Sequence, residues 1–158
     1  MTTAIRKPRE LEPIYDAKTY QPSSSVGYLV NRARTEMLAA MDRELEPLDV
    51  TSAQYIIMAH FTHGLVDSVS SLCKGVAYDP GAMTRMIDRL EAKGLARRVR
   101  DSEDRRAVKI ELTEEGKVLF PKMRVKVVGV VNHMLRDFTK SEARQFENLL
   151  QRALANFA

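Results

Sequence analysis

The sequence predicts a mainly α fold with one small β-hairpin, an α+β arrangement. Over most of the 158 residues, apolar side chains recur at intervals of three and four, which is the spacing of amphipathic helices. In the second half of the chain, residues 108–112 instead alternate apolar and charged side chains, as strands do. The expected order is three helices, a basic fourth helix, a hairpin and two further helices.

The first two helices are expected on either side of Pro47. Caps are available at Ser23 to Ser25, and Pro47 ends the first helix. Thr51 with Gln54 three residues later forms a capping box that opens the second helix. The apolar positions of the first helix are Val26, Leu29, Ala33, Met37, Met41 and Leu45.

A weaker third helix is expected from Ser68, interrupted by Gly75. The fourth helix has clearer signals, since Asp79 can cap it and Pro80 suits its first position. Its apolar stripe consists of Met83, Met86, Ile87 and Leu90, and its opposite face consists of Thr84, Arg85, Asp88 and Arg89.

The hairpin follows at once, with strands expected at 95–100 and 108–112 and a polar turn, DSEDRR, between them. Thr113 then opens a long helix in which Pro121 is expected to introduce a bend or delay the regular start. A second capping box, Thr139 with Glu142, opens the last helix.

The composition fits one domain that needs no cross-link. A chain of this length can remove roughly 70% of its unfolded surface from water, and its single cysteine cannot form an internal disulfide. No apolar run approaches the roughly 20 residues that cross a bilayer, and the N-terminus carries charges and prolines where a signal peptide is apolar. We therefore expect a soluble, cytoplasmic protein with no membrane partner.

The excess positive charge is concentrated in one segment. Residues 84–109 contain nine bases and five acids, and this difference equals the net charge of +4 of the whole chain. A local excess of this kind suits an anionic polymer. The alternative is an ordinary solvated surface, and charge alone does not separate the two.

The helix and hairpin favour the nucleic-acid interpretation. Arg85 and Arg89 are one turn apart and share a face, and each arginine can bond two acceptors of guanine. Thr84 can meet a base or a thymine methyl group. The remaining assignments are the minor groove for Arg105 and Arg106 and the phosphates for Lys93, Arg97 and Arg98.

Residues 80–116, PGAMTRMIDRLEAKGLARRVRDSEDRRAVKIELTEEG, resemble the winged helix-turn-helix core of the MarR family of bacterial transcription regulators. The specific part is DSEDRR followed by LTEEG, and the resemblance extends over about residues 24–157. The segment SSLCKGVAYDPG departs from the family's usual pattern of alanine, leucine and serine. The resemblance implies a recognition helix at 79–93, a wing at 97–107, and a homodimer that binds double-stranded DNA at a palindromic operator, as a repressor.

This resemblance also implies a domain organisation. Residues 1–22 form an N-terminal arm, and residues 23–158 form a single MarR-type domain. Within it, the winged helix-turn-helix covers about 51–113, and the dimerisation helices cover about 24–46 and 114–157.

Members of the family commonly release DNA on binding small aromatic acids. Our hypothesis is that Arg32 pairs with the ligand carboxylate, and that Tyr28, His60 and His63 supply walls or hydrogen bonds. The alternatives are a surface or dimer salt bridge for Arg32 and ordinary helix positions for the two histidines.

Other classes are less favoured by the sequence. A zinc site would need His60, His63 and His133 to meet in the fold, and Cys73 lies on an apolar stripe, which favours a buried, inert thiol over a redox sensor. The chain has no phosphate-binding loop and no nucleophile elbow, so we expect neither an enzyme nor a cofactor. An oxidant- or metal-responsive regulator and a winged-helix protein-interaction module stay as alternatives.

Overall fold

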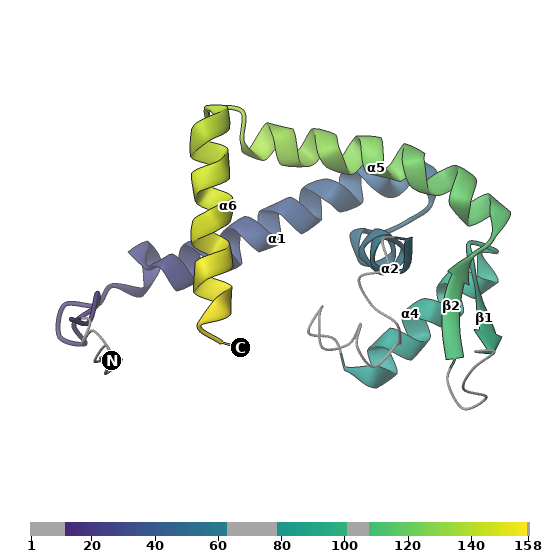
Figure 1. Ribbon diagram of the computed structural model, residues 1–158, viewed down its shortest axis with the longest axis horizontal. Coiled ribbons are helices and arrows are strands. Elements are labelled where there is room, and N and C mark those ends of the chain that lie inside the picture. The colour runs from purple at the N-terminus through teal and green to yellow at the C-terminus, as the bar shows by residue number, and fades with distance from the viewer. Residues whose placement is uncertain (1–11, 63–78, 101–107, 158) are drawn as a thin grey trace, which may run out of the picture. The chain divides into compact units, whose positions relative to one another are not determined.

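A computed structural model describes residues 12–62, 79–100 and 108–157. The chain divides into two compact units, residues 1–35 and 36–158, and each is described by itself. Figure 1 shows the elements with their labels. The third helix expected from Ser68 lies outside the described residues.

The first unit contains the short 3-10 helix Pro22–Ser24 and the beginning of α1 (Val26–Leu45). The start of α1 is capped by side chains that precede it. Ser25 Oγ accepts a hydrogen bond from the Tyr28 amide at 3.3 Å, and the Tyr15 hydroxyl accepts one from the Val26 amide at 2.9 Å. The rings of Tyr15 and Tyr20 meet edge to face with centroids 5.4 Å apart. The second half of the expected arm is therefore tied to the helix that follows it.

Among its described residues, the second unit contains the remainder of α1 and seven further elements. They are the 3-10 helix Glu46–Leu48, α2 (Ser52–Thr62), α4 (Pro80–Ala92), β1 (Ala96–Arg100), β2 (Val108–Leu112), α5 (Glu114–Met134) and α6 (Lys140–Ala155). The expected fold class is confirmed, since helices predominate and the described strands form one antiparallel pair. None of the described helices combines the length and apolar character that crossing a bilayer requires.

The predicted caps are present. Thr51 and Gln54 exchange hydrogen bonds at the start of α2, with the Thr51 amide 3.0 Å from Gln54 Oε1 and the Gln54 amide 3.3 Å from Thr51 Oγ1. The Asp79 carboxylate accepts from the Ala82 amide at 2.9 Å and begins α4. These helix starts follow from bonds between near neighbours, which is why the sequence predicts them well.

Pro121 does not delay α5, and that part of the prediction is wrong. The helix begins at Glu114, where Thr113 Oγ1 accepts from the Gly116 amide at 3.1 Å. A proline removes one amide donor from the helical ladder, but the first turn of α5 comes before that position and is already closed by the Thr113 cap.

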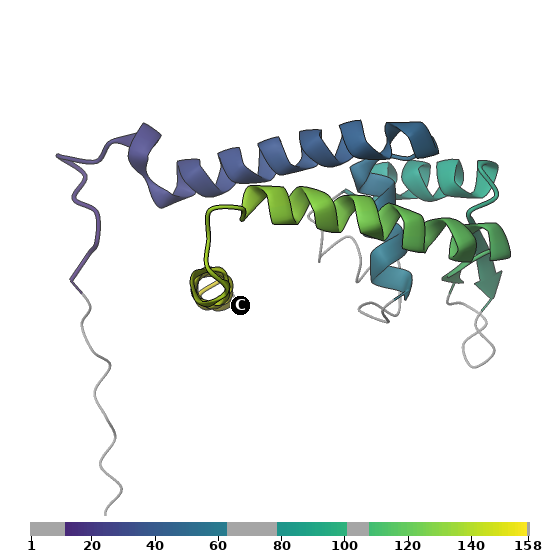
Figure 2. The same cartoon turned by 90° about the horizontal axis from the view of Figure 1, so that it is seen from above.

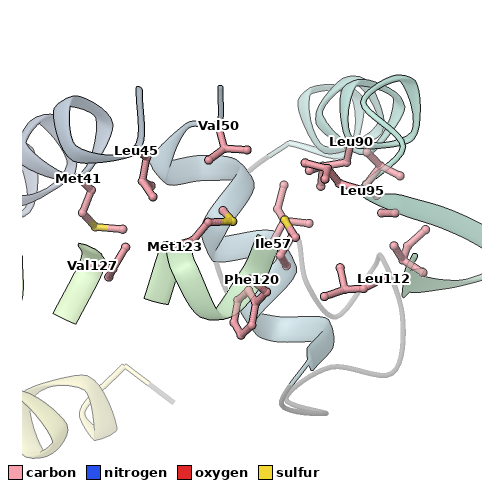
Figure 3. Close-up of a cluster of buried hydrophobic side chains, with 14 of the residues drawn as sticks. Met41, Leu45, Val50, Ile57, Leu90, Leu95, Leu112, Phe120, Met123 and Val127 are labelled. Carbon is pink, nitrogen blue, oxygen red and sulfur yellow. The ribbon is translucent and has the colours of Figure 1, made fainter. Parts of the chain in front are cut away.

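The core of the second unit lies where α1, α2, α4, α5 and the hairpin converge, as Figure 3 shows. Side chains from four helices are fully buried there: Leu45, Ile57, Met58, Met83, Ile87, Leu90 and Met123. On its edge, the rings of Tyr55 and Phe120 stack with centroids 5.6 Å apart. The α6 helix contributes no buried residue, and Figure 2 shows it set apart from α5 beyond the connecting turn.

The turn between α4 and β1 orients the hairpin. Gly94 has a positive φ of 67°, its amide donates to the Glu91 carbonyl, and the Leu95 amide donates to the Leu90 carbonyl. These two bonds form a Schellman motif, which ends a helix and reverses the chain. The strands then pair with Ala96 opposite Leu112.

Candidate nucleic-acid interface

The α4 helix separates its side chains into a buried face and an exposed face. Met83, Ile87 and Leu90 are at most 1% exposed and anchor the helix in the core. The opposite face is solvent-exposed and consists of the predicted residues Thr84, Arg85, Asp88 and Arg89. A helix held in this way can present its outer face to a large partner without losing its own packing.

Arg85 and Arg89 form no ion pair with any residue that the structure describes. The Arg85 side chain points toward Gly81 at the start of α4. Its Nη1 lies 3.5 Å from the position that a Cβ atom would take if residue 81 had a side chain. The Thr84 hydroxyl donates to the Pro80 carbonyl at 2.9 Å, which leaves its methyl group and a lone pair for a partner. On this exposed face, two guanidinium groups therefore have no donor bonded to a described residue.

The three residues predicted to contact phosphates already have acidic partners. Lys93 Nζ lies 3.0 Å from Asp49 Oδ2 and also donates to the Asp49 carbonyl. Arg97 Nη2 lies 3.1 Å from Glu111 Oε2, directly across the hairpin. Arg98 pairs with carboxylates of α4. The predicted wing-tip residues Arg105 and Arg106 lie outside the described residues.

The predicted effector residues are spread over both units. Tyr28 and Arg32 are exposed on α1 in the first unit. His60 is half-buried on α2 in the second unit, and its Nδ1 is hydrogen-bonded to the Ile56 carbonyl at 2.7 Å. This bond to the preceding turn fits the ordinary helix position considered as an alternative. His63 and Cys73 lie outside the described residues.

A cleft of about 430 Å³ opens between the end of α1 and the second half of α5. It is lined by Ala40, Arg43, Glu44, Lys126, Gly129, Val130 and His133. Lys126 Nζ lies 3.3 Å from Glu44 Oε2 across it. Sequence reasoning did not identify this cleft, because its basic residues Arg43 and Lys126 are more than 80 positions apart and no spacing connects them.

Within the described ranges, no three histidine, cysteine or acidic side chains are grouped so that they could hold a metal ion. His133 lines the cleft together with Arg43, Lys126 and Glu44, and the two basic side chains disfavour a cation there.

This chain is similar to known transcription regulators. The family model for the transcriptional regulator SarA/Rot matches residues 43–123. The multiple antibiotic resistance protein MarR of Escherichia coli (strain K12) is 30% identical over 135 residues, which cover 84% of this chain and 91% of MarR. The HTH-type transcriptional repressor MdtR of Bacillus subtilis (strain 168) is 31% identical over 122 residues, 77% of this chain and 76% of MdtR.

A solved structure of mutant MarR from E. coli complexed with operator DNA is similar to this chain with a TM-score of 0.72 and 28% identity, covering 81% of this chain and 92% of the other. Residues 43–123, which the SarA/Rot family model matches, include α4, β1 and β2, where exposed basic side chains lie. The chain therefore belongs to the MarR family of winged helix-turn-helix transcription regulators.

Proposed function

We propose that this regulator acts in the cytoplasm as a repressor, that it binds a palindromic operator as a homodimer, and that a small aromatic acid releases it. The observation that carries the DNA-binding part is the outer face of α4, where Arg85 and Arg89 are exposed and have no acidic partner among the described residues. No catalytic step is part of the proposal.

Each side chain has a proposed task. Arg85, Arg89 and Thr84 read base edges in the major groove, where a guanidinium can make two bonds to guanine. Arg105 and Arg106 enter the minor groove, where a narrow A·T-rich stretch concentrates negative potential. Lys93, the residue directly after α4, and Arg97, on β1, contact phosphates, exchanging their present carboxylate partners for the DNA backbone.

A homodimer would place two recognition helices about 34 Å apart, one turn of DNA, on matched half-sites. The proposed effector site consists of Arg32 with Tyr28, His60 and His63. An effector that binds better when the spacing of the two recognition helices does not fit DNA would release the operator.

The test is DNA binding by the purified protein to the region upstream of its own gene, at two salt concentrations, with and without benzoates, cinnamates and hydroxynicotinates. We expect specific binding that weakens steeply as salt rises, because neutralised phosphates release counterions. Relief by one compound supports the effector proposal, and Arg32→Ala should abolish that relief. Specific binding that no compound relieves favours an oxidant- or metal-responsive regulator.

Arg85→Ala tests the base-reading assignment, with Lys122→Ala on the exposed side of α5 as the matched loss of one charge. We expect Arg85→Ala to lose about 1–3 kcal/mol of discrimination between operator and random DNA. Lys122→Ala should change neither affinity. An equal loss on both DNAs for Arg85→Ala would contradict base reading. If the protein bound neither operator nor random DNA above background, a winged-helix protein-interaction module would be favoured.

A further inference from the structure

Arg98, in the middle of β1, is bonded to α4 at three points. Its Nη2 lies 2.7 Å from Asp88 Oδ1, its Nη1 donates to Glu91 Oε2, and its backbone amide donates to Glu91 Oε1 at 2.8 Å. Asp88 and Glu91 are three residues apart and therefore share one face of α4. The contact joins the helix both to the side chain and to the backbone of the strand.

These bonds restrict how α4 lies against the hairpin. The apolar contacts of α4 with the core are non-directional and permit small shifts of the helix along the sheet. A planar guanidinium between two carboxylates has a defined geometry, and the bond to the backbone amide ties that geometry to the strand. Arg98 therefore fixes the helix that carries Arg85 and Arg89 relative to β1.

The charge around Arg98 is unfavourable for a phosphate contact. One guanidinium faces two carboxylates, so the group of Arg98, Asp88 and Glu91 has a net charge of −1 and repels an approaching phosphate. The side chain is also only 35% exposed, whereas Arg97 beside it is 65% exposed. The two adjacent arginines of β1 thus differ in surroundings.

We propose that Arg98 is a positioning residue, which holds the recognition helix against the wing through Asp88 and Glu91 and makes no contact with DNA. The proposal replaces the phosphate contact expected from the sequence, and it rests on the proposed reading of DNA by α4.

Arg98→Gln separates positioning from a phosphate contact, with Arg97→Gln as the matched change at the neighbouring residue. We expect Arg98→Gln to lower operator affinity about tenfold, in the range of measured couplings between contacting residues, and to leave random-DNA affinity and the salt dependence nearly unchanged. A phosphate contact would instead weaken binding to both DNAs alike and reduce the slope of log affinity against log salt by about 0.9. We expect this second pattern for Arg97→Gln. If Arg98→Gln gave the same pattern, the proposal would be overturned.

Reversal of the pair is the decisive second variant. Glu91→Arg combined with Arg98→Glu restores an ion pair between α4 and β1 while reversing the charge on the strand. We expect the double variant to recover part of the operator affinity that either single variant loses, because Asp88 still faces the carboxylate introduced at position 98. If circular dichroism shows that the double variant is folded and it recovers none of the operator affinity, the proposal is overturned.

Failure of the proposed function is distinguishable from failure of this inference. If the unaltered protein shows no specific operator binding, the proposed function fails before any variant is compared. Urea unfolding without DNA then still tests the helix-to-strand link: the two single variants and the double variant should show a non-additive effect on the unfolding midpoint. Additive effects there would contradict the link itself.

Discussion

At the residue scale, Gly116 shows how one missing side chain permits the junction between hairpin and α5. A Cβ at this position would lie 2.0 Å from the Leu95 carbonyl oxygen, much closer than two such atoms can approach. The Leu95 carbonyl accepts the Thr113 amide at 3.2 Å, so it is held where the clash would occur. Glycine is required here by close approach of the backbone, not by its φ angle.

We predict that Gly116→Ala lowers the free energy of unfolding by about 1–3 kcal/mol, the usual cost of overpacking. Urea denaturation monitored by circular dichroism measures it. Gly129→Ala on the same helix is the control, because a Cβ there meets nothing within 4 Å. Alanine should stabilise that position by about 0.5–1 kcal/mol. Changes of the same sign at both positions would contradict the close-approach explanation.

At the element scale, α6 depends on a charged cap. Glu142 accepts from the Thr139 amide and from the Thr139 hydroxyl, each at 2.8 Å, while the Glu142 amide donates to Thr139 Oγ1 at 3.2 Å. The hydrogen bond from the Thr139 amide, followed by that from its hydroxyl, lowers the pKa of the Glu142 carboxyl. The ionised carboxylate is therefore the form that the folded helix prefers.

This sets the sign of a pH effect. A carboxyl whose pKa is lower in the folded state stabilises the fold above its unfolded pKa and loses that contribution as the pH falls through the folded pKa. We predict that α6 of the wild type loses stability as the pH falls below 4.5, the ordinary pKa of a glutamate carboxyl. Glu142→Gln should lack that component of the pH dependence. Equilibrium unfolding at a series of pH values compares the two proteins, and identical acid dependence would rule the cap out as its source.

Pro121 is the other feature to judge at this scale. It lies in α5 on the exposed side and supplies no amide to bond the Lys117 carbonyl, one turn earlier. We predict that Pro121→Ala stabilises the protein by about 1–3 kcal/mol, since proline inside a helix is about 3 kcal/mol less favourable than alanine. Thermal unfolding measures the change. An unchanged or lower midpoint would mean that proline at this position has a compensating role.

At the scale of the whole molecule, α6 has the character of a helix that another surface covers. It contributes nothing buried, yet Phe146, Leu149 and Leu154 are exposed by 36%, 49% and 68%. Exposed apolar stripes of this kind mark interaction sites. The proposed homodimer is the natural occupant, since the family resemblance assigns the last two helices to dimerisation.

We predict that Leu149→Glu on the apolar side of α6 shifts the protein toward a monomer, because it introduces a charge into the proposed interface. Arg144→Glu, on the same helix but outside the apolar stripe, is the matched control and should leave the mass unchanged. Light scattering after size-exclusion chromatography measures the mass, and operator binding should weaken in parallel with dissociation. A dimer of unchanged stability with Leu149→Glu would exclude α6 from the interface.

Local sequence was sufficient to predict the fold class and the starts of most described helices. Asp79, Thr113 and Thr139 cap helices through bonds to amides three residues away, and such contacts depend only on near neighbours. The two faces of α4 follow for the same reason, because helical periodicity sorts its side chains before any tertiary contact forms.

Pairings between distant segments required the folded chain. Lys93 meets Asp49, 44 positions earlier, and Lys126 meets Glu44, 82 positions earlier. The sequence marks all of these residues as charged but cannot tell which guanidinium or ammonium group already has a carboxylate within bonding distance. Arg85, which has no such partner among the described residues, and Arg98, which has two, look alike in the sequence. They differ because a hydrogen-bonded ion pair forms only when the two charged groups are in direct contact, and that contact is set by how the helices and the hairpin pack.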